Sequence, residues 1–98
     1  MILLKNLKFE KPTNVWDIKV DRTTPFGNPY FMYNELLRDR VCNNFELYFY
    51  KRINEDIIFK KELLRLHELY IKYGKLNLFC WCYPKRCHAE IIKQYLLI

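Results

Sequence analysis

The spacing of hydrophobic and polar residues predicts two strands and a loop in the first third of this 98-residue chain. The apolar segment 2–9 predicts the first strand. The second is predicted over 15–20, where Trp16, Ile18 and Val20 alternate with charged residues. The next segment, DRTTPFGNPYF, contains two prolines and a glycine and therefore predicts a loop.

Two helices are expected in the middle of the chain. From about 33 to 53, apolar residues recur at every fourth position, which is a helical period. Asn54, followed by two acidic residues, predicts the N-cap of a second helix. We expect this helix to end at Gly74, because glycine readily adopts the backbone conformation that stops a helix.

The last third predicts one buried strand and one helix. Segment 75–82, KLNLFCWC, is almost uniformly apolar, as expected for a strand covered on both faces. Apolar residues then recur at helical spacing from Ile91 to Leu96. The order β-β-α-α-β-α predicts an α/β fold, a small three-layer domain over 1–98 in which at least two parallel strands are flanked by about three helices.

The predicted topology places two loops at one edge of the sheet. If strands 15–20 and 75–82 are parallel, the loops DRTTPFGNP and CYPKRCH leave the same edge, beside the N-terminus of the final helix. Open parallel sheets bind ligands at this edge, and a helix N-terminus favours an anion. We therefore predict an anionic ligand. The expected ligand-binding residues are Arg22, Asn28, Arg38, Lys85, Arg86 and His88.

Charge agrees with an anionic partner. Seventeen Lys and Arg residues against eleven Asp and Glu residues give a net charge of +6 and a pI near 9.2. This balance favours nucleotides or nucleic acid as partners, although solvated surface lysines give the same count. No apolar run approaches the roughly 20 residues that span a bilayer. The N-terminal segment also has no signal-peptide pattern, so we expect a cytoplasmic protein, in the host cytoplasm if viral, without a membrane partner.

The segment CWCYPKRCHAE is open to three interpretations. Cys80, Cys82, Cys87 and His88 have the side chains of a zinc site, but four ligands within nine residues would close almost no chain, so zinc is possible and no cofactor is favoured. Alternatively, Cys87 at a helix N-terminus is a nucleophile with a lowered pKa, His88 is its acid or base, and Cys82 is the second candidate. In the third interpretation the thiols pack in the core, and Cys87 with Glu90 forms a capping box.

The order of these motifs resembles a family. Its members read Gly-Arg, then Gly-Asn-Pro-Phe, then an arginine that opens a helix, then Cys-Trp-Cys and Cys-His-Gly or Cys-His-Ala. The chain is similar in these features to the family known as domain of unknown function 4326, found in phages and bacteria. The resemblance implies a compact α/β fold and often a viral source. The matching residues are Arg22, Gly27, Asn28, Pro29, Arg38, Cys80, Trp81, Cys82, Cys87 and His88, whereas Asp21 replaces the usual glycine.

These patterns favour a small phage-type protein that binds or sequesters a phosphate-bearing ligand, a nucleotide or a nucleotide-derived signal. A cysteine-dependent enzyme acting on a nucleotide or phosphoester is the first alternative. A basic nucleic-acid-binding module or a zinc-stabilised interaction module is the second. No oligomeric state follows from the sequence pattern.

Overall fold

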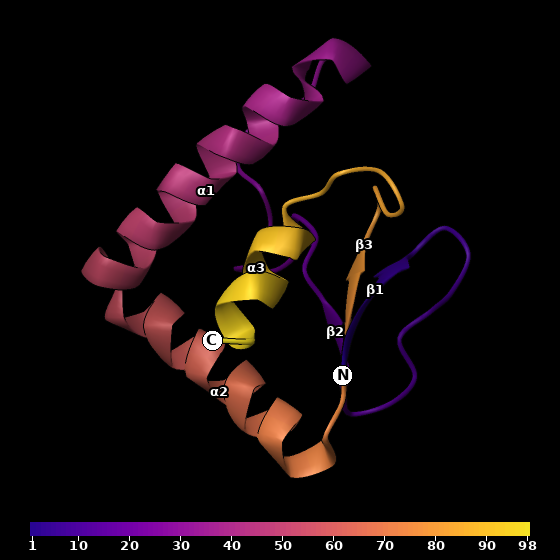
Figure 1. Cartoon of the computed structure of the whole chain (residues 1–98), viewed down its shortest axis with the longest axis vertical. Coiled ribbons are helices and arrows are strands. Elements are labelled where there is room, and N and C mark those ends of the chain that lie inside the picture. Colours follow the sequence, from indigo (N-terminus) through magenta and orange to yellow (C-terminus); the bar gives the residue numbers. More distant parts are fainter.

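The computed structural model describes all 98 residues and consists of a three-stranded parallel sheet with helices stacked against it (Figure 1). The elements are β1 (Ile2–Asn6), β2 (Asp17–Lys19), the 3₁₀ turn η1 (Glu35–Leu37), α1 (Arg38–Glu55), α2 (Ile57–Tyr73), β3 (Leu76–Cys80) and α3 (Ala89–Leu96). The strand order is β1-β3-β2, with β3 parallel to both neighbours. The predicted small α/β fold is confirmed, as is the parallel pairing of the second and last strands.

The core lies on the helical side of the sheet. Leu76, Leu78 and Cys80 of β3 are fully buried against the helices. The sheet contacts α3, and α2 contacts both α3 and β3, so the sheet, α3 and the α1–α2 pair form successive layers (Figure 1). The strand residues that alternate with the core residues are more polar than the core residues. Among them, Asn77 Nδ2 donates to Asp17 Oδ1 at 2.8 Å. One face of the sheet thus builds the core.

The two long helices meet at a sharp corner. Asp56 Oδ1 accepts from the backbone N–H groups of Ile58 and Phe59, both at 3.1 Å, and so caps α2. The predicted N-cap at Asn54 is wrong, because α1 continues to Glu55. Asp56 is preferred because its other oxygen also accepts from Arg52, one turn earlier, at 3.2 Å. The hydrogen bond from Phe59, followed by that from Arg52, lowers the pKa of Asp56.

The ends of the other elements have local causes. Gly74 ends α2 as predicted, with a φ of 69° and its N–H donating to Tyr70 O at 2.8 Å. The first strand stops at Asn6 rather than residue 9, because the Asn6 side chain accepts from the Lys8 N–H at 2.8 Å and turns the chain. The helix expected from 33 begins with η1, where Asn34 accepts from the backbone N–H of Leu36. No helix combines the length and apolar composition that a bilayer crossing requires.

Candidate functional site

A cavity of about 440 Å³ lies at the carboxyl ends of β2 and β3. Segment 21–32 forms one wall, the first turns of α1 form a second, and segment 81–88 forms the third. The edge predicted from the topology therefore carries a cavity. Of the predicted ligand-binding residues, Arg22, Asn28, Arg38, Arg86 and His88 line it, whereas Lys85 does not.

The loop after β2 is held in a tight turn. A Cβ at Gly27 would lie 2.5 Å from both Arg22 Cα and Asp21 O, so only glycine lets the chain approach this closely. Burial opposes ionisation of Asp21, but hydrogen bonds from Thr23 and Trp81 outweigh it, and the pKa of this carboxyl is lowered. Asp21 is therefore a carboxylate whose oxygens are used within the protein.

Arg22 fastens this loop and retains free donors. Its Nε donates to Asn28 O at 2.9 Å and its Nη2 to Tyr30 O at 2.7 Å. The guanidinium carbon lies 4.4 Å from the centre of the Phe31 ring. Two of the five N–H groups of Arg22 are thus occupied. The side-chain oxygen of Asn28 accepts from the Tyr30 N–H at 2.9 Å, which is its turn-forming role.

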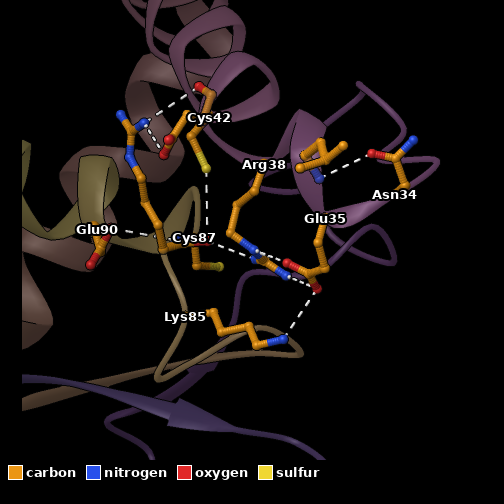
Figure 2. A network of polar contacts seen from close by, with 10 residues as sticks. Asn34, Glu35, Arg38, Cys42, Lys85, Cys87 and Glu90 are labelled. Atoms are coloured by element: carbon orange, nitrogen blue, oxygen red, sulfur yellow. Dashed lines mark hydrogen bonds and ion pairs between the residues drawn. The ribbon is translucent and has the colours of Figure 1, made fainter.

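Arg38 is the centre of the polar network in Figure 2. It forms a two-point ion pair with Glu35, with both N–O distances 2.8 Å, and its Nη1 donates to Arg86 O at 2.8 Å. Lys85 approaches Glu35 from the other side at 3.3 Å. Hydrogen bonds from Arg38 and then Lys85 lower the pKa of Glu35 to about 2. The predicted clamp residue Lys85 is therefore bound to a carboxylate outside the cavity.

Segment 85–88 is pinned to α1 by further contacts. Arg86 Nη1 donates to Asp39 Oδ1 at 3.0 Å and Arg86 Nη2 to Asn43 Oδ1 at 2.9 Å. The Cys42 thiol donates to Arg86 O at 3.8 Å. Burial raises the pKa of Cys42. The cavity wall is thus rigidly tied to the first turns of α1.

His88 joins β2 to α3. Its Nε2 lies 2.6 Å from Val20 O, and because a carbonyl only accepts, Nε2 carries the hydrogen. Nδ1 is then the acceptor, and it lies 3.4 Å from Cys87 Sγ. Burial is the main cause of the lowered pKa of His88, and the charge of Arg22 adds to it. His88 is 8% exposed and neutral, and both nitrogens face protein groups.

Cys87 does not have the lowered pKa expected of a helix-terminal nucleophile, and that expectation is wrong. Hydrogen bonds to the sulfurs of Cys80 and Cys82, followed by burial, raise its pKa strongly, and the residue is 2% exposed. The capping-box interpretation holds only in part, because the N-cap of α3 is His88, which makes no side-chain cap hydrogen bond. The Cys87 sulfur accepts from the Ala89 N–H, and Glu90 accepts from the Cys87 N–H at 3.4 Å. These contacts occupy part of the α3 N-terminus on which anion binding was predicted to depend.

Of the three thiols in this cluster, Cys82 has the pKa that is lowered furthest. Cys87 has one hydrogen to donate, and its sulfur contacts the sulfurs of Cys80 and Cys82 as well as His88 Nδ1, so it donates to one of the three at a time. Cys80 is fully buried and donates to Lys5 O at 3.7 Å, and the hydrogen bond from Cys87 lowers its pKa to about 7, less far than that of Cys82. Cys82 is half-buried and also receives a hydrogen bond from Arg38. The hydrogen bond from Cys87, and after it the Arg38 contact, lower the pKa of Cys82 to about 6.

The zinc candidates do not assemble into a metal site. No group of three or more His, Cys, Asp or Glu side chains in the chain has an arrangement that could hold a metal ion.

The cavity also contains residues that sequence reasoning missed. Phe31 and Trp81 are large aromatic residues, 63% and 60% exposed, and both line it. The strand predicted over 75–82 ends at Cys80, so Trp81 lies beyond it, and its Nε1 donates to Asp21 Oδ2 at 3.2 Å. The available signals were the position of Phe31 at the end of the predicted loop and the place of Trp81 in the Cys-Trp-Cys motif.

Fold and site together define a small α/β domain of the open parallel-sheet class, with a ligand-sized cavity at the carboxyl edge of its strands. The family described as a domain of unknown function (DUF4326) matches residues 5–97, and the chain belongs to this family. The resemblance noted in the sequence is thereby confirmed. No curated protein and no solved structure matches the chain.

Proposed function

We propose that the protein binds and sequesters a phosphate-bearing small molecule, a nucleotide or nucleotide-derived signal, in the cavity at the carboxyl ends of β2 and β3. One observation carries the proposal. Three arginines and two exposed aromatic residues line the same 440 Å³ cavity, and they are Arg22, Arg38, Arg86, Phe31 and Trp81.

The charge of the lining favours an anion. Three arginines line the cavity together with one carboxylate, Asp21, and the Cys82 sulfur, and the Asp21 oxygens already accept from Thr23 and Trp81. Arg22 has three N–H groups left after its two bonds to the loop backbone. Arginine suits phosphate because its planar fork donates two parallel hydrogen bonds. Arg22 is therefore the proposed phosphate contact, whereas Arg38 and Arg86 are already paired with the carboxylates of Glu35 and Asp39.

The aromatic residues favour a planar group beside the phosphate. Phe31 follows the loop that holds Arg22, and Trp81 lies on the opposite wall with its indole fixed by Asp21. A nucleobase stacks on such side chains with a gain of about 1–3 kcal/mol per base. The cavity volume falls within the range typical of small-molecule sites, about 300–1,000 Å³. This size favours a single nucleotide over an extended nucleic-acid strand.

Thermal unfolding with a panel of nucleoside monophosphates, diphosphates, triphosphates and cyclic nucleotides tests the proposal. We expect at least one class to raise the melting temperature of the wild type. Phe31→Ala removes an exposed ring of the cavity with little effect on folding, and we expect it to abolish the shift. Leu47→Ala is the matched control, an exposed apolar residue of α1 outside the cavity, and should keep the shift. Equal shifts in the two variants would contradict the proposed site.

A cysteine-dependent enzyme is the second candidate, favoured by the Cys82 thiolate in the same cavity. In this candidate Cys82 replaces Cys87 as the nucleophile, because Cys87 is buried and protonated. His88 does not suit the role of general base toward a cavity ligand, since its unprotonated nitrogen faces Cys87. Turnover assays on each nucleotide that binds test this candidate. Turnover is measured as released phosphate and, by chromatography, as released base. Loss of turnover in Cys82→Ser is the expected result.

A further inference from the structure

We propose that Cys82 is a site of reversible oxidation by hydroperoxides, and that Cys87 is the thiol that resolves the oxidised sulfur into a Cys82–Cys87 disulfide. The inference stands apart from the nucleotide proposal, because it needs only the two sulfurs and access through the cavity. It assigns a modification site to the CYPKRC segment.

The geometry brings the two sulfurs together. The chain reverses after β3, where the Lys85 N–H donates to Cys82 O at 2.9 Å, and this turn returns Cys87 to Cys82. The two side chains line the same cavity, and the contact with Cys87 is the first cause of the lowered pKa of Cys82. Figure 2 shows the Cys87 sulfur pointing to the side on which Arg38 lies. A five-residue spacing and a shared wall make a short covalent link compatible with the fold.

The two thiols differ in the ways that the two roles require. Cys82 is half-buried, reachable from the cavity, and receives hydrogen bonds from Arg38 and Cys87 that favour its thiolate. Cys87 is buried and protonated. Cysteines that react with peroxides are accessible thiolates, often beside a second cysteine. Cys80 is also near Cys87, but it is fully buried and a peroxide cannot reach it.

The chemistry proceeds in two balanced steps. The Cys82 thiolate attacks the terminal oxygen of ROOH; an S–O bond forms, the O–O bond breaks, and RO⁻ leaves and takes a proton from solvent. The Cys87 sulfur then attacks the Cys82 sulfenic acid; an S–S bond forms, and hydroxide leaves and combines with the Cys87 proton to give water. His88 Nδ1, an acceptor 3.4 Å from Cys87 Sγ, is placed to carry that proton. The peroxide gains the two electrons that the two sulfurs lose.

Oxidation of the whole protein with hydrogen peroxide, read by intact mass and peptide mapping, tests the inference. Lys85 and Arg86 lie between the two cysteines, so trypsin separates them unless a disulfide joins the peptides. We expect the wild type to lose two hydrogen atoms and to yield the joined peptides, and a reductant to reverse both changes. Cys80→Ser, the control, should give the same result.

The variant Cys87→Ser separates the two roles. Without the resolving thiol, Cys82 should stop at the sulfenic acid, which dimedone traps at that residue. Cys82→Ser should remove both products. A disulfide between Cys80 and Cys87 in the wild type, or a wild type that forms no internal disulfide under peroxide, would overturn the inference. Because the wild type alone gives these two readouts, the test does not depend on whether the variants fold.

Discussion

His88 Nε2 lies 2.6 Å from Val20 O and so ties the start of α3 to the end of β2 across 68 residues of sequence. This bond holds the start of α3 against the edge of the sheet at which the cavity lies. It also fixes the imidazole tautomer, which leaves Nδ1 facing Cys87. The edge of the sheet that carries the cavity is therefore also the edge at which α3 is joined to the end of β2.

The first prediction concerns this bond. His88→Ala removes a buried hydrogen bond. It also removes the edge-on contact between the imidazole and the Phe45 ring, whose centres lie 5.1 Å from each other. We expect a loss of about 2–3 kcal/mol in the free energy of unfolding, measured by urea denaturation. His67→Ala on α2, where the imidazole has no hydrogen bond, should cost less than about 0.5 kcal/mol. Equal losses would show that the Val20–His88 link does not stabilise the fold.

The lowered pKa of His88 gives a second prediction. The folded protein binds fewer protons at this residue than the unfolded chain does, so stability falls as pH drops below 6.5, the ordinary histidine value. We expect the urea midpoint of the wild type to decline between pH 6.5 and 5, and His88→Asn to decline less. The carboxylates with lowered pKa values, Asp17, Asp21, Glu35 and Asp56, lose their contributions only at more acidic pH. An identical decline in both proteins would assign the effect to another group.

The two glycines of the chain give the third prediction, because they are required for different reasons. Gly27→Ala places a methyl group against the backbone of Asp21 and Arg22, and we expect a cost of about 1–3 kcal/mol together with weaker ligand binding. Gly74→Ala meets no atom but keeps a φ of 69°, so we expect about 1 kcal/mol and unchanged binding. Urea denaturation and ligand titration of both variants measure the difference. Unchanged binding in Gly27→Ala would show that the conformation of this loop does not affect the ligand site.

The charge of Cys82 leads to the fourth prediction. Cys82→Ser removes a negative charge beside Arg38, so the cavity should bind a phosphate-bearing ligand about fivefold more tightly at pH 7.5, measured by calorimetry. Cys80→Ser, at a buried cysteine outside the cavity, should leave the affinity unchanged. A weaker complex with Cys82→Ser would mean that the sulfur contacts the ligand favourably.

A fifth prediction uses the pH dependence of Cys82 alkylation. Because only the thiolate reacts, the rate with iodoacetamide should rise with pH around a midpoint of about 6. Arg38 and Cys87 lower this midpoint, whereas the charge of Glu35 raises it. Glu35→Gln should therefore move the midpoint to lower pH, and Glu62→Gln, which breaks the equivalent pair with Arg65 on α2, should not. If the midpoint of the wild type were near that of an ordinary thiol, Cys82 would not be a thiolate at neutral pH.

The sequence was sufficient to predict the edge of the sheet and its loops. Alternation around Ile18, the apolar run that contains Leu78 and the helical periods between them predict a parallel pair, and parallel strands end at one edge. Arg22 and His88 were placed near each other on that basis alone, and both line the cavity. Local patterns also predicted the stop at Gly74.

Properties that depend on tertiary approach were not predictable from local pattern. Lys85 and Arg86 were expected to face an anion, but the start of α1 offers carboxylates to both side chains. The pKa of Cys87 rises because other sulfurs and the core surround it, and that burial outweighs the favourable helix end. At the helix corner, Asn54 and Asp56 are equally good caps by residue type. Arg52, spaced one turn before Asp56, is the signal that distinguishes them.

The central claim, that the cavity holds a phosphate-bearing small molecule, is tested most directly by native mass spectrometry of protein taken from cells and then supplemented with nucleotides. The account predicts a one-to-one adduct that contains phosphate in the wild type and in Leu47→Ala, and its loss in Phe31→Ala. An adduct that persists in Phe31→Ala, or a wild type that binds none of the supplied nucleotides, would contradict it.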